Sequence, residues 1–386
     1  MVEATATLLL AGSLNNSGAF LNQGTVDWTG GSFTGTGSIT NDGTLNANGG
    51  NNHNTATNIT NNAGKTINWN DGHLDVSGGG QTLTNYGTFN LIGNNPSGFT
   101  CQMSIVNKSG GSIVKGGTTS TNLSISQPFT NEGGGTVTVN SGASLAFQTG
   151  GNITNDGTFN VGGTVNNTLS GTYGGAFNVA SGATINFSNT STNSTFSGTT
   201  FTNNGTVSVA SGRSMVFGGA ALQTLARNGT SITALTINNA SDLNITGSQT
   251  VTGALTFTAG KVYLQNGDLS VGSLSGATSN KYFVTFGTSR LMQLVGTSAN
   301  AFPVGPSTAS YNPVTLNQAS GSDTYGVRVQ TGFDYPIGGS DYVNRQWTID
   351  RTPGNTTATI VALQWNSPAD EQGVFVSSNC HVSRWT

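Results

Sequence analysis

"GNITNDGTFNVGG", residues 151–163, decides the fold of this chain, because variants of it recur along the first half of the sequence. The copies are aligned on the Asn that precedes the turn, and successive copies lie 19 to 24 residues apart, except for one step of 48. We count that step as two units, because "GGAFNVASG" at 174–182 occupies the intervening place. The aligned residues are Asn22, Asn41, Asn61, Asn85, Asn107, Asn131, Asn155 and Asn203. Short strands joined by Gly/Asn turns at this period predict the coils of a parallel β-solenoid.

Each copy reads as a strand, a corner and a second strand. Apolar residues alternate after the corner, so side chains such as Phe159 and Val161 are expected to point inward. Corner Gly is expected to adopt positive φ, and the Asn amide to bond the corner backbone or the Asn of the next coil. The predicted structural corners are Asn41 with Gly43, Asn85 with Gly87, Asn155 with Gly157, and Asn203 with Gly205. A second phrase with a Ser-Gly corner, as in "FNVASGATINF" at 177–187, predicts at least two corners and three faces in every coil.

Trp28, Ala47 and Trp69 occupy equivalent places in three successive coils. Indoles in such a row could stack on sugar rings, but they share the parity of inward-pointing residues. We therefore interpret them as core, with the small Ala47 making room between two indoles.

Composition divides the chain into three parts. We predict β-solenoid repeats over 1–219 and a shorter-coil continuation or cap over 220–279. A β-sandwich-like domain is predicted over 280–386, where most prolines and tryptophans lie. The fold class is all-β, a parallel β-solenoid followed by a C-terminal antiparallel β-sandwich.

Residues 255–386 resemble large repeat-containing, secreted cell-surface proteins of the Bacteroidetes, which are adhesin-like. The resemblance rests on "LTFTAGKVYLQNGDLSV", "YFVTFG", "AFPVG" (301–305), "YNPVTL" (311–316), "VNRQWTID" (343–350) and "LQWNSPADE" (363–371), in that order. It implies export to the cell surface through the type IX pathway. The sequence departs from that family in lacking a signal peptide and a terminal sorting domain, which fits a fragment of a longer protein.

Charge and cysteine content exclude several classes. Charged residues make up 7% of the chain and the net charge is -3, so there is no basic track for a nucleic acid. No apolar stretch is long enough to span a bilayer. Cys101 and Cys380 lie in compositionally different regions and are expected to be packed or free thiols rather than a disulfide pair.

The repeats supply little catalytic chemistry, so we predict no enzyme activity and no cofactor. The best cluster is "NDGHLDV", in which Asp71, His73 and Asp75 alternate onto one face, and His53 lies one coil earlier. These residues are weak candidates for a metal site, and a solvated polar face is the preferred interpretation. Ice binding requires Thr at identical places in consecutive coils, and Thr25, Thr44, Thr88 and Thr158 recur after the corner Gly. We interpret them as bonding the backbone instead.

The predicted function is a non-enzymatic extracellular structural or adhesive protein, a cell-surface stalk or filament subunit. The alternative is an ancillary carbohydrate-binding part of a larger polysaccharide-active enzyme. Expected partners are other copies, in head-to-tail or filament contacts, or glycans and host cells. The C-terminal sandwich can cap one end of the solenoid, whereas the segment "VEATATLLLAGSLNNSG" offers little to block the other.

Overall fold

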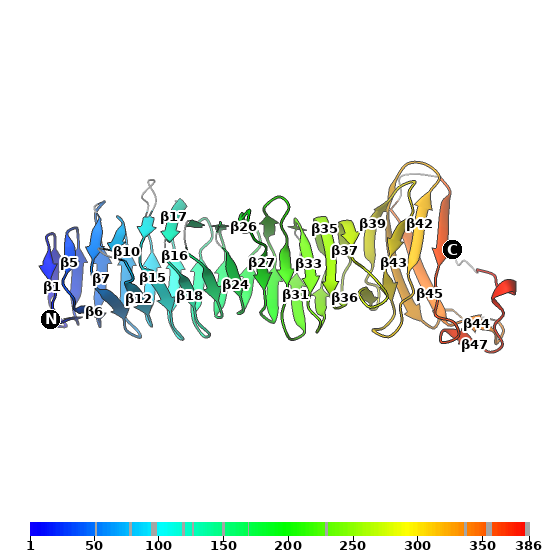
Figure 1. The fold of residues 1–386 in the computed structure, drawn as a ribbon, viewed down its shortest axis with the longest axis horizontal. Helices are drawn as coiled ribbons and strands as arrows, with labels where there is room; N and C mark the ends of the chain where they lie inside the picture. Colours follow the sequence, from blue (N-terminus) through cyan, green and yellow to red (C-terminus); the bar gives the residue numbers. More distant parts are fainter. Residues whose placement is uncertain are drawn as a thin grey trace. The chain divides into compact units, whose positions relative to one another are not determined.

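A computed structural model gives the fold of the chain (Figure 1). It describes residues 1–382 except 51, 77–78, 94–98, 118–119, 126, 149–150, 169, 228–230, 336–337 and 353–356. The chain forms two compact units, unit 1 from Met1 to Leu235 and unit 2 from Thr236 to Thr386. The observed division thus lies after Leu235, whereas composition placed boundaries at 219 and 279.

Unit 1 is a parallel β-solenoid with three strand positions in each coil, which confirms the predicted fold class and the three faces. In Figure 1 its strands, blue to green, follow one another in sequence order. The first face contains β1 (Thr7–Leu10), β4 (Thr25–Trp28), β7 (Thr44–Ala47), β10 (Thr66–Trp69), β13 (Thr88–Leu91), β16 (Ser112–Lys115), β19 (Thr136–Val139), β22 (Thr158–Val161), β25 (Phe177–Val179), β28 (Thr200–Asn203) and β31 (Gln223–Arg227).

The second face contains β2 (Leu14–Asn15), β5 (Ser32–Thr34), β8 (His53–Thr55), β11 (Leu74–Val76), β14 (Phe99–Cys101), β17 (Ser120–Ile125), β20 (Ser144–Gln148), β23 (Thr164–Asn167), β26 (Thr184–Phe187), β29 (Thr206–Val209) and β32 (Ser231–Ile232). The third face contains β3 (Ala19–Asn22), β6 (Ser38–Asn41), β9 (Asn58–Asn61), β12 (Thr82–Asn85), β15 (Ser104–Asn107), β18 (Phe129–Asn131), β21 (Ile153–Asn155), β24 (Gly171–Tyr173), β27 (Ser194–Phe196) and β30 (Met215–Phe217). β33 (Leu235–Asn238) begins at the last residue of unit 1.

Unit 2 begins with parallel strands and ends with antiparallel sheets. One parallel row is β34 (Leu243–Thr246), β36 (Val262–Gln265), β38 (Phe283–Thr285) and β41 (Val304–Gly305), and a second is β35 (Gln249–Ala259), β37 (Leu269–Ser275) and β39 (Leu291–Val295). β39 then pairs antiparallel with β43 (Asp323–Thr331), and β43 with β45 (Arg345–Arg351).

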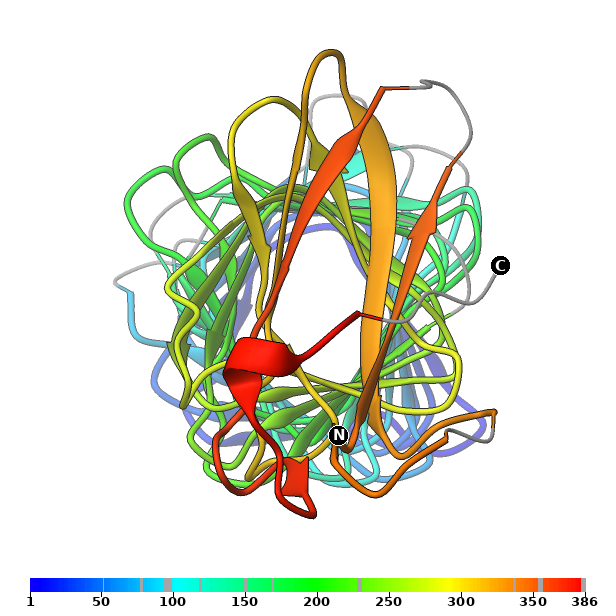
Figure 2. The same cartoon turned by 90° about the vertical axis from the view of Figure 1, so that its right-hand side faces the viewer.

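A second antiparallel sheet of unit 2 comprises β40 (Asn300–Phe302), β42 (Val314–Gln318) and β46 (Thr359–Leu363). A small ribbon of β44 (Tyr342–Val343) and β47 (Glu371–Gln372) precedes the 3-10 helix η1 (Ser377–Asn379). Figure 2 shows these strands in yellow to red. Parallel pairing therefore extends to Gly305, into the region 280–386 that composition assigned to the sandwich. The sequence did not reveal these parallel strands because they lack the Asn-x-Gly phrase.

The core of unit 1 follows the predicted alternation. Phe89, Phe159, Val161 and Val207 are at most 2% exposed. The strand register pairs Ala47 with both Trp28 and Trp69, and all three side chains are buried, so the row is core as predicted.

The two-residue corners do not use positive φ, so that prediction is wrong. Gly43, Gly87, Gly157 and Gly205 lie outside the left-handed region, which is adopted instead by glycines of longer or Ser-Gly corners such as Gly134 (φ 85°) and Gly182 (φ 76°). Glycine is needed at the short corners because the coils approach closely. A Cβ on Gly157 would lie 2.3 Å from the carbonyl oxygen of Gly135 in the preceding coil.

The alignment of Asn203 with the other repeat asparagines is also wrong. Asn203 ends β28 on the first face and pairs with Val179, whereas Asn155 ends β21 on the third face. The same local phrase therefore serves a different corner here. The coils also approach closely at this corner, where a Cβ on Gly205 would lie 2.4 Å from the carbonyl oxygen of Ala183.

Candidate functional site

The four candidate metal ligands do not converge. β8 and β11 pair His53 with Leu74, not with His73, so the two histidines differ by one residue in register. His53 points into the core and is fully buried, whereas Asp71, His73 and Asp75 are half-buried. Among the residues that the structure describes, no group of three or more His, Cys, Asp or Glu side chains could hold a metal ion.

His53 instead fills the space that Ala47 leaves between the two indoles. Its ring lies edge-on to Trp28 and Trp69, with centroid distances of 5.1 and 5.3 Å. Nε2 lies 2.8 Å from the carbonyl oxygen of Trp28, which can only accept, so Nε2 carries the hydrogen and donates the hydrogen bond. Nδ1 is buried and has no hydrogen-bond partner among the described residues. Burial lowers the pKa of His53 below its ordinary value of 6.5, because the charged ring would lose its hydration.

The corner asparagines form a continuous internal ladder, which we call the Asn ladder: Asn22, Asn41, Asn61, Asn85, Asn107, Asn131 and Asn155. All seven side chains are 0% exposed. Nδ2 of each of the first six donates to Oδ1 of the next Asn at 2.6 to 2.8 Å. Each of the first six also donates to the carbonyl oxygen of the Thr or Ser that opens the next first-face strand.

The Asn ladder stops at Asn155. The next three places in its column are taken by Tyr173, Phe196 and Phe217. At its other end the place before Asn22 is taken by Val2, which is apolar, and Oδ1 of Asn22 is buried without a donor among the described residues. The sequence therefore predicted the ladder itself but not its limits.

The first face presents a column of hydroxyl side chains. The register aligns Thr25, Thr44, Thr66, Thr88, Ser112, Thr136 and Thr158 in seven consecutive coils. None of the side-chain hydrogen bonds found among the described residues involves these hydroxyls, so the structure gives no support to their interpretation as backbone-bonding groups. Beside them runs a second column in which Asn46, Asn68 and Asn90 bond one another at 2.9 Å.

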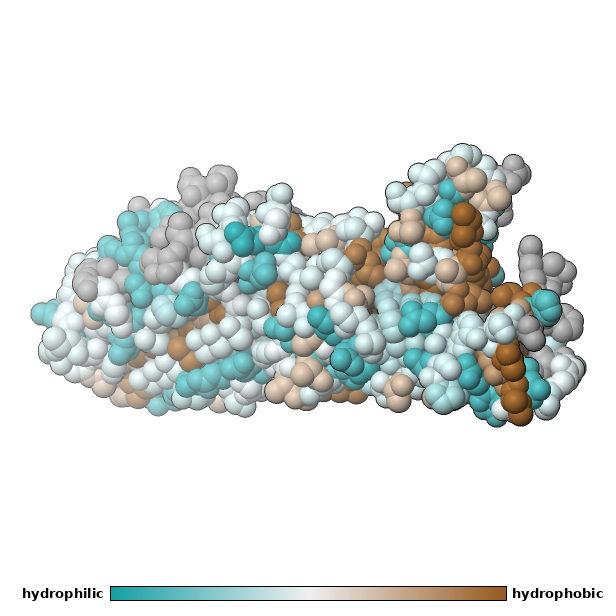
Figure 3. Space-filling model, turned by 45° about the vertical axis from the view of Figure 1, so that its right-hand side comes forward, coloured by the Kyte–Doolittle hydropathy of each residue, from teal (hydrophilic) through white to brown (hydrophobic). Residues whose placement is uncertain are grey.

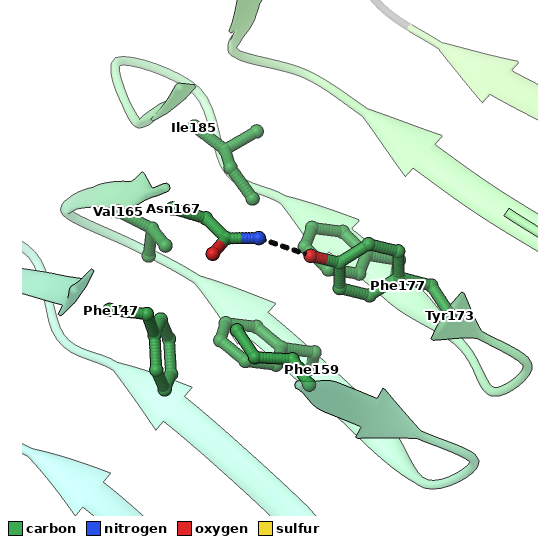
Figure 4. A pocket seen from close by; sticks show the side chains of 8 residues that line it. Phe147, Phe159, Val165, Asn167, Tyr173, Phe177 and Ile185 are labelled. Carbon is green, nitrogen blue, oxygen red and sulfur yellow. Dashed lines mark hydrogen bonds between the residues drawn. The ribbon is translucent and has the colours of Figure 1, made fainter. Parts of the chain in front are cut away.

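Two hollows accompany these features, and neither has a converging set of reactive groups. An interior cavity of about 10 Å³ lies between coils, where the Asn167 amide donates to the Tyr173 hydroxyl at 2.6 Å (Figure 4). The aromatic rings of Phe147, Phe159 and Phe177 line it. This volume holds at most one water molecule. A surface hollow lies along the Ser-Gly corners at Gly142 and Gly182 and the Gly-Gly corner at Gly163.

Unit 2 contains a buried polar cluster that sequence reasoning did not find. Arg345 forms an ion pair with Asp370, whose carboxylate also accepts from Asn312 Nδ2 at 2.6 Å and from the backbone of Asn366 at 2.8 Å. Arg345 Nη2 donates to Ser310 Oγ at 3.0 Å. Asn312, Arg345 and Asp370 come from three separate segments, "YNPVTL", "VNRQWTID" and "LQWNSPADE", which meet at one point. The cluster ties the start of β42 to the start of β45 and to the turn before β47.

Cys101 and Cys380 are both free thiols, the first buried and the second exposed. Burial raises the pKa of the Cys101 thiol to about 12, so it stays protonated. In the described residues no helix is long and apolar enough to cross a membrane.

Comparison of the chain with protein-family models, with curated proteins and with solved structures finds no match. The fold therefore defines its class: an all-β repeat protein whose unit 1 is a parallel β-solenoid.

Proposed function

We propose that this protein is a non-enzymatic extracellular structural or adhesive protein, a stalk or filament subunit displayed on a cell surface. The Asn ladder is the main support for this proposal. The same internal hydrogen bond repeats from coil to coil, so each further coil lengthens the solenoid without introducing reactive side chains. The eleven first-face strands of unit 1, at about 4.8 Å each, give a stack on the order of 50 Å.

Residues that could have supported the carbohydrate-binding alternative have other roles in the core. Trp28 and Trp69 are at most 1% exposed and cannot serve as sugar platforms. His53 is packed between them rather than facing solvent. The resemblance of residues 255–386 to Bacteroidetes surface proteins supports an extracellular location and export by the type IX pathway.

Protease treatment and immunogold labelling of intact native cells test this role. We expect the protein to be labelled and cleaved without lysis, and a deletion strain to lose adherence or surface fibres. Protection from protease until lysis would overturn the surface role. Release of reducing sugar ends from polysaccharides by the purified chain would overturn the non-enzymatic role.

A second candidate, binding of ordered water, is favoured by the hydroxyl column of the first face. Its hydroxyl side chains are regularly spaced and carry no charge. In the neighbouring column, Asp27 is charged, whereas the aligned Asn46 and Asn68 are not. Thermal hysteresis and ice-recrystallisation assays test it, with Thr66→Tyr on this face and Thr60→Tyr on the third face as a matched pair. Equal results for the two variants would count against it.

A further inference from the structure

β1 is a strand with one free edge. It pairs only with β4 among the described residues, so the backbone groups of its other edge have no strand partner. Leu8, which has inward parity, is only half-buried, and Leu9 is 65% exposed. The equivalent inward residue of the next coil, Val26, is 0% exposed. Val2 forms a β-bridge with Asn22 on the third face rather than with β1.

β46, in unit 2, is a second such strand. Among the described residues it pairs only with β42. Val361 lies beside Leu316 on the core side of the sheet, yet it is 46% exposed whereas Leu316 is 0% exposed. On the opposite side Ile360 is 63% exposed. Figure 3 shows apolar residues gathered on the visible surface of the C-terminal part of the chain.

Charge distinguishes these two edges from that of β45, which pairs only with β43 among the described residues. Edge strands that must stay unpaired are commonly protected by charged residues. β45 carries Arg345, Asp350 and Arg351 along its seven residues. β1 reads "TLLL" and β46 reads "TIVAL", with no charge in either. The two strands are therefore open to pairing, whereas β45 is protected.

We propose that β1 of one copy and β46 of a second copy pair edge to edge, so that copies of this chain join head to tail. Both strands present a row of unpaired backbone groups flanked by exposed aliphatic side chains, so each can complete the backbone hydrogen bonding of the other. Because the contact joins two different surfaces, every open assembly keeps one free β1 edge and one free β46 edge at its ends, and the contact extends into chains unless it closes into a ring. This inference rests on the proposed structural role and specifies how copies would assemble.

Light scattering during size exclusion of the full chain at micromolar concentration tests the pairing, together with two edge variants. Leu9→Lys charges the β1 edge and Ile360→Lys charges the β46 edge at a residue of almost equal exposure. The wild type is expected to elute as a series of masses above the 39.2 kDa of one chain. Each variant alone should be monomeric. An equimolar mixture should recover one intact junction and give a dimer of about twice that mass, without larger species.

Leu294→Lys is the matched control. Leu294 is 61% exposed on β39, which is paired on both sides by β37 and β43, so this variant should assemble like the wild type. A symmetric contact of like edges would leave one edge variant self-associating and would give no recovery on mixing, which would refute the head-to-tail pairing. A monomeric wild type would also refute it. Neither result bears on a single-copy surface stalk, which the protease and adherence experiments decide separately.

Discussion

The side-chain amide of Asn85 donates a hydrogen bond of 2.7 Å to Oδ1 of Asn107, one coil further along, and both side chains are fully buried. Asn107 in turn donates to Asn131. Asn107→Ala would leave the Asn85 donor short of one partner and the Asn131 acceptor without one. Each buried unsatisfied group costs about 1 to 3 kcal/mol, so we expect the free energy of unfolding to fall by about 2 to 4 kcal/mol in urea titrations. Asn90→Ala, in the half-exposed outer column, should cost less than about 1 kcal/mol. Equal effects would show that burial does not strengthen the ladder.

Gly157 and Gly182 should respond to substitution for opposite reasons. A side chain at Gly157 collides with the Gly135 carbonyl oxygen, so Ala and Asn should both destabilise by about 3 kcal/mol. Gly182 has open space around it but a φ of 76°, so Ala should cost about 1 kcal/mol and Asn, which tolerates this conformation, should cost less. Thermal unfolding of the four variants measures this. A Gly157→Asn protein as stable as Gly182→Asn would contradict the close approach of the coils.

His53 should make stability depend on pH. Its folded pKa is lowered, so the unfolded chain takes up the proton first as the pH falls. Stability is therefore complete above the ordinary histidine pKa of about 6.5 and decreases below it, with a slope of up to about 1.4 kcal/mol per pH unit. Urea titrations between pH 5 and pH 8 measure the slope. His53→Phe should flatten it, whereas His73→Ala, at a half-buried residue, should keep it. An unchanged slope in His53→Phe would assign the effect to other groups.

Arg345 should be far more important for stability than a surface arginine. Arg345→Met leaves the carboxylate of Asp370, which is 2% exposed, without its charged partner, and we expect a loss of about 3 to 5 kcal/mol. Arg290→Met removes ion pairs of 2.7 and 2.8 Å to Asp268 and Asp350 at a partly exposed site, and should cost at most about 1 kcal/mol. Chemical unfolding monitored by tryptophan fluorescence compares the two. Similar losses would mean that the buried cluster is not a structural tie.

The predictable part of this fold was local. Alternation around Phe159 and Val161 identified strands and core, because side chains of a strand alternate with a period of two. The internal Asn ladder also followed from one residue type recurring at one corner. The prediction of positive φ at the short corners failed because glycine is needed there for contacts between neighbouring coils. Gly43 is glycine because of a carbonyl oxygen in the preceding coil, and no local pattern reports that contact.

The candidate site failed for a related reason. A register difference of one residue turns a strand's side chains to the opposite face, so aligning His53 with His73 instead of Leu74 placed a core residue on the surface. The Arg345 and Asp370 pair joins segments 25 residues apart, and only the antiparallel sheets of unit 2 bring them together.

The Asn ladder also makes chain length an inheritable variable. Each rung recognises only the amide of the next rung, and Asn85, Asn107 and Asn131 meet their neighbours with the same atoms. Removing residues 86–107 in one recombination event would bring Asn85 opposite Asn131 with the corner chemistry intact. Duplicating the same segment would add one rung. Unequal crossing-over between repeats can therefore shorten or extend such a protein in whole steps, and selection for reach can act without redesigning the core.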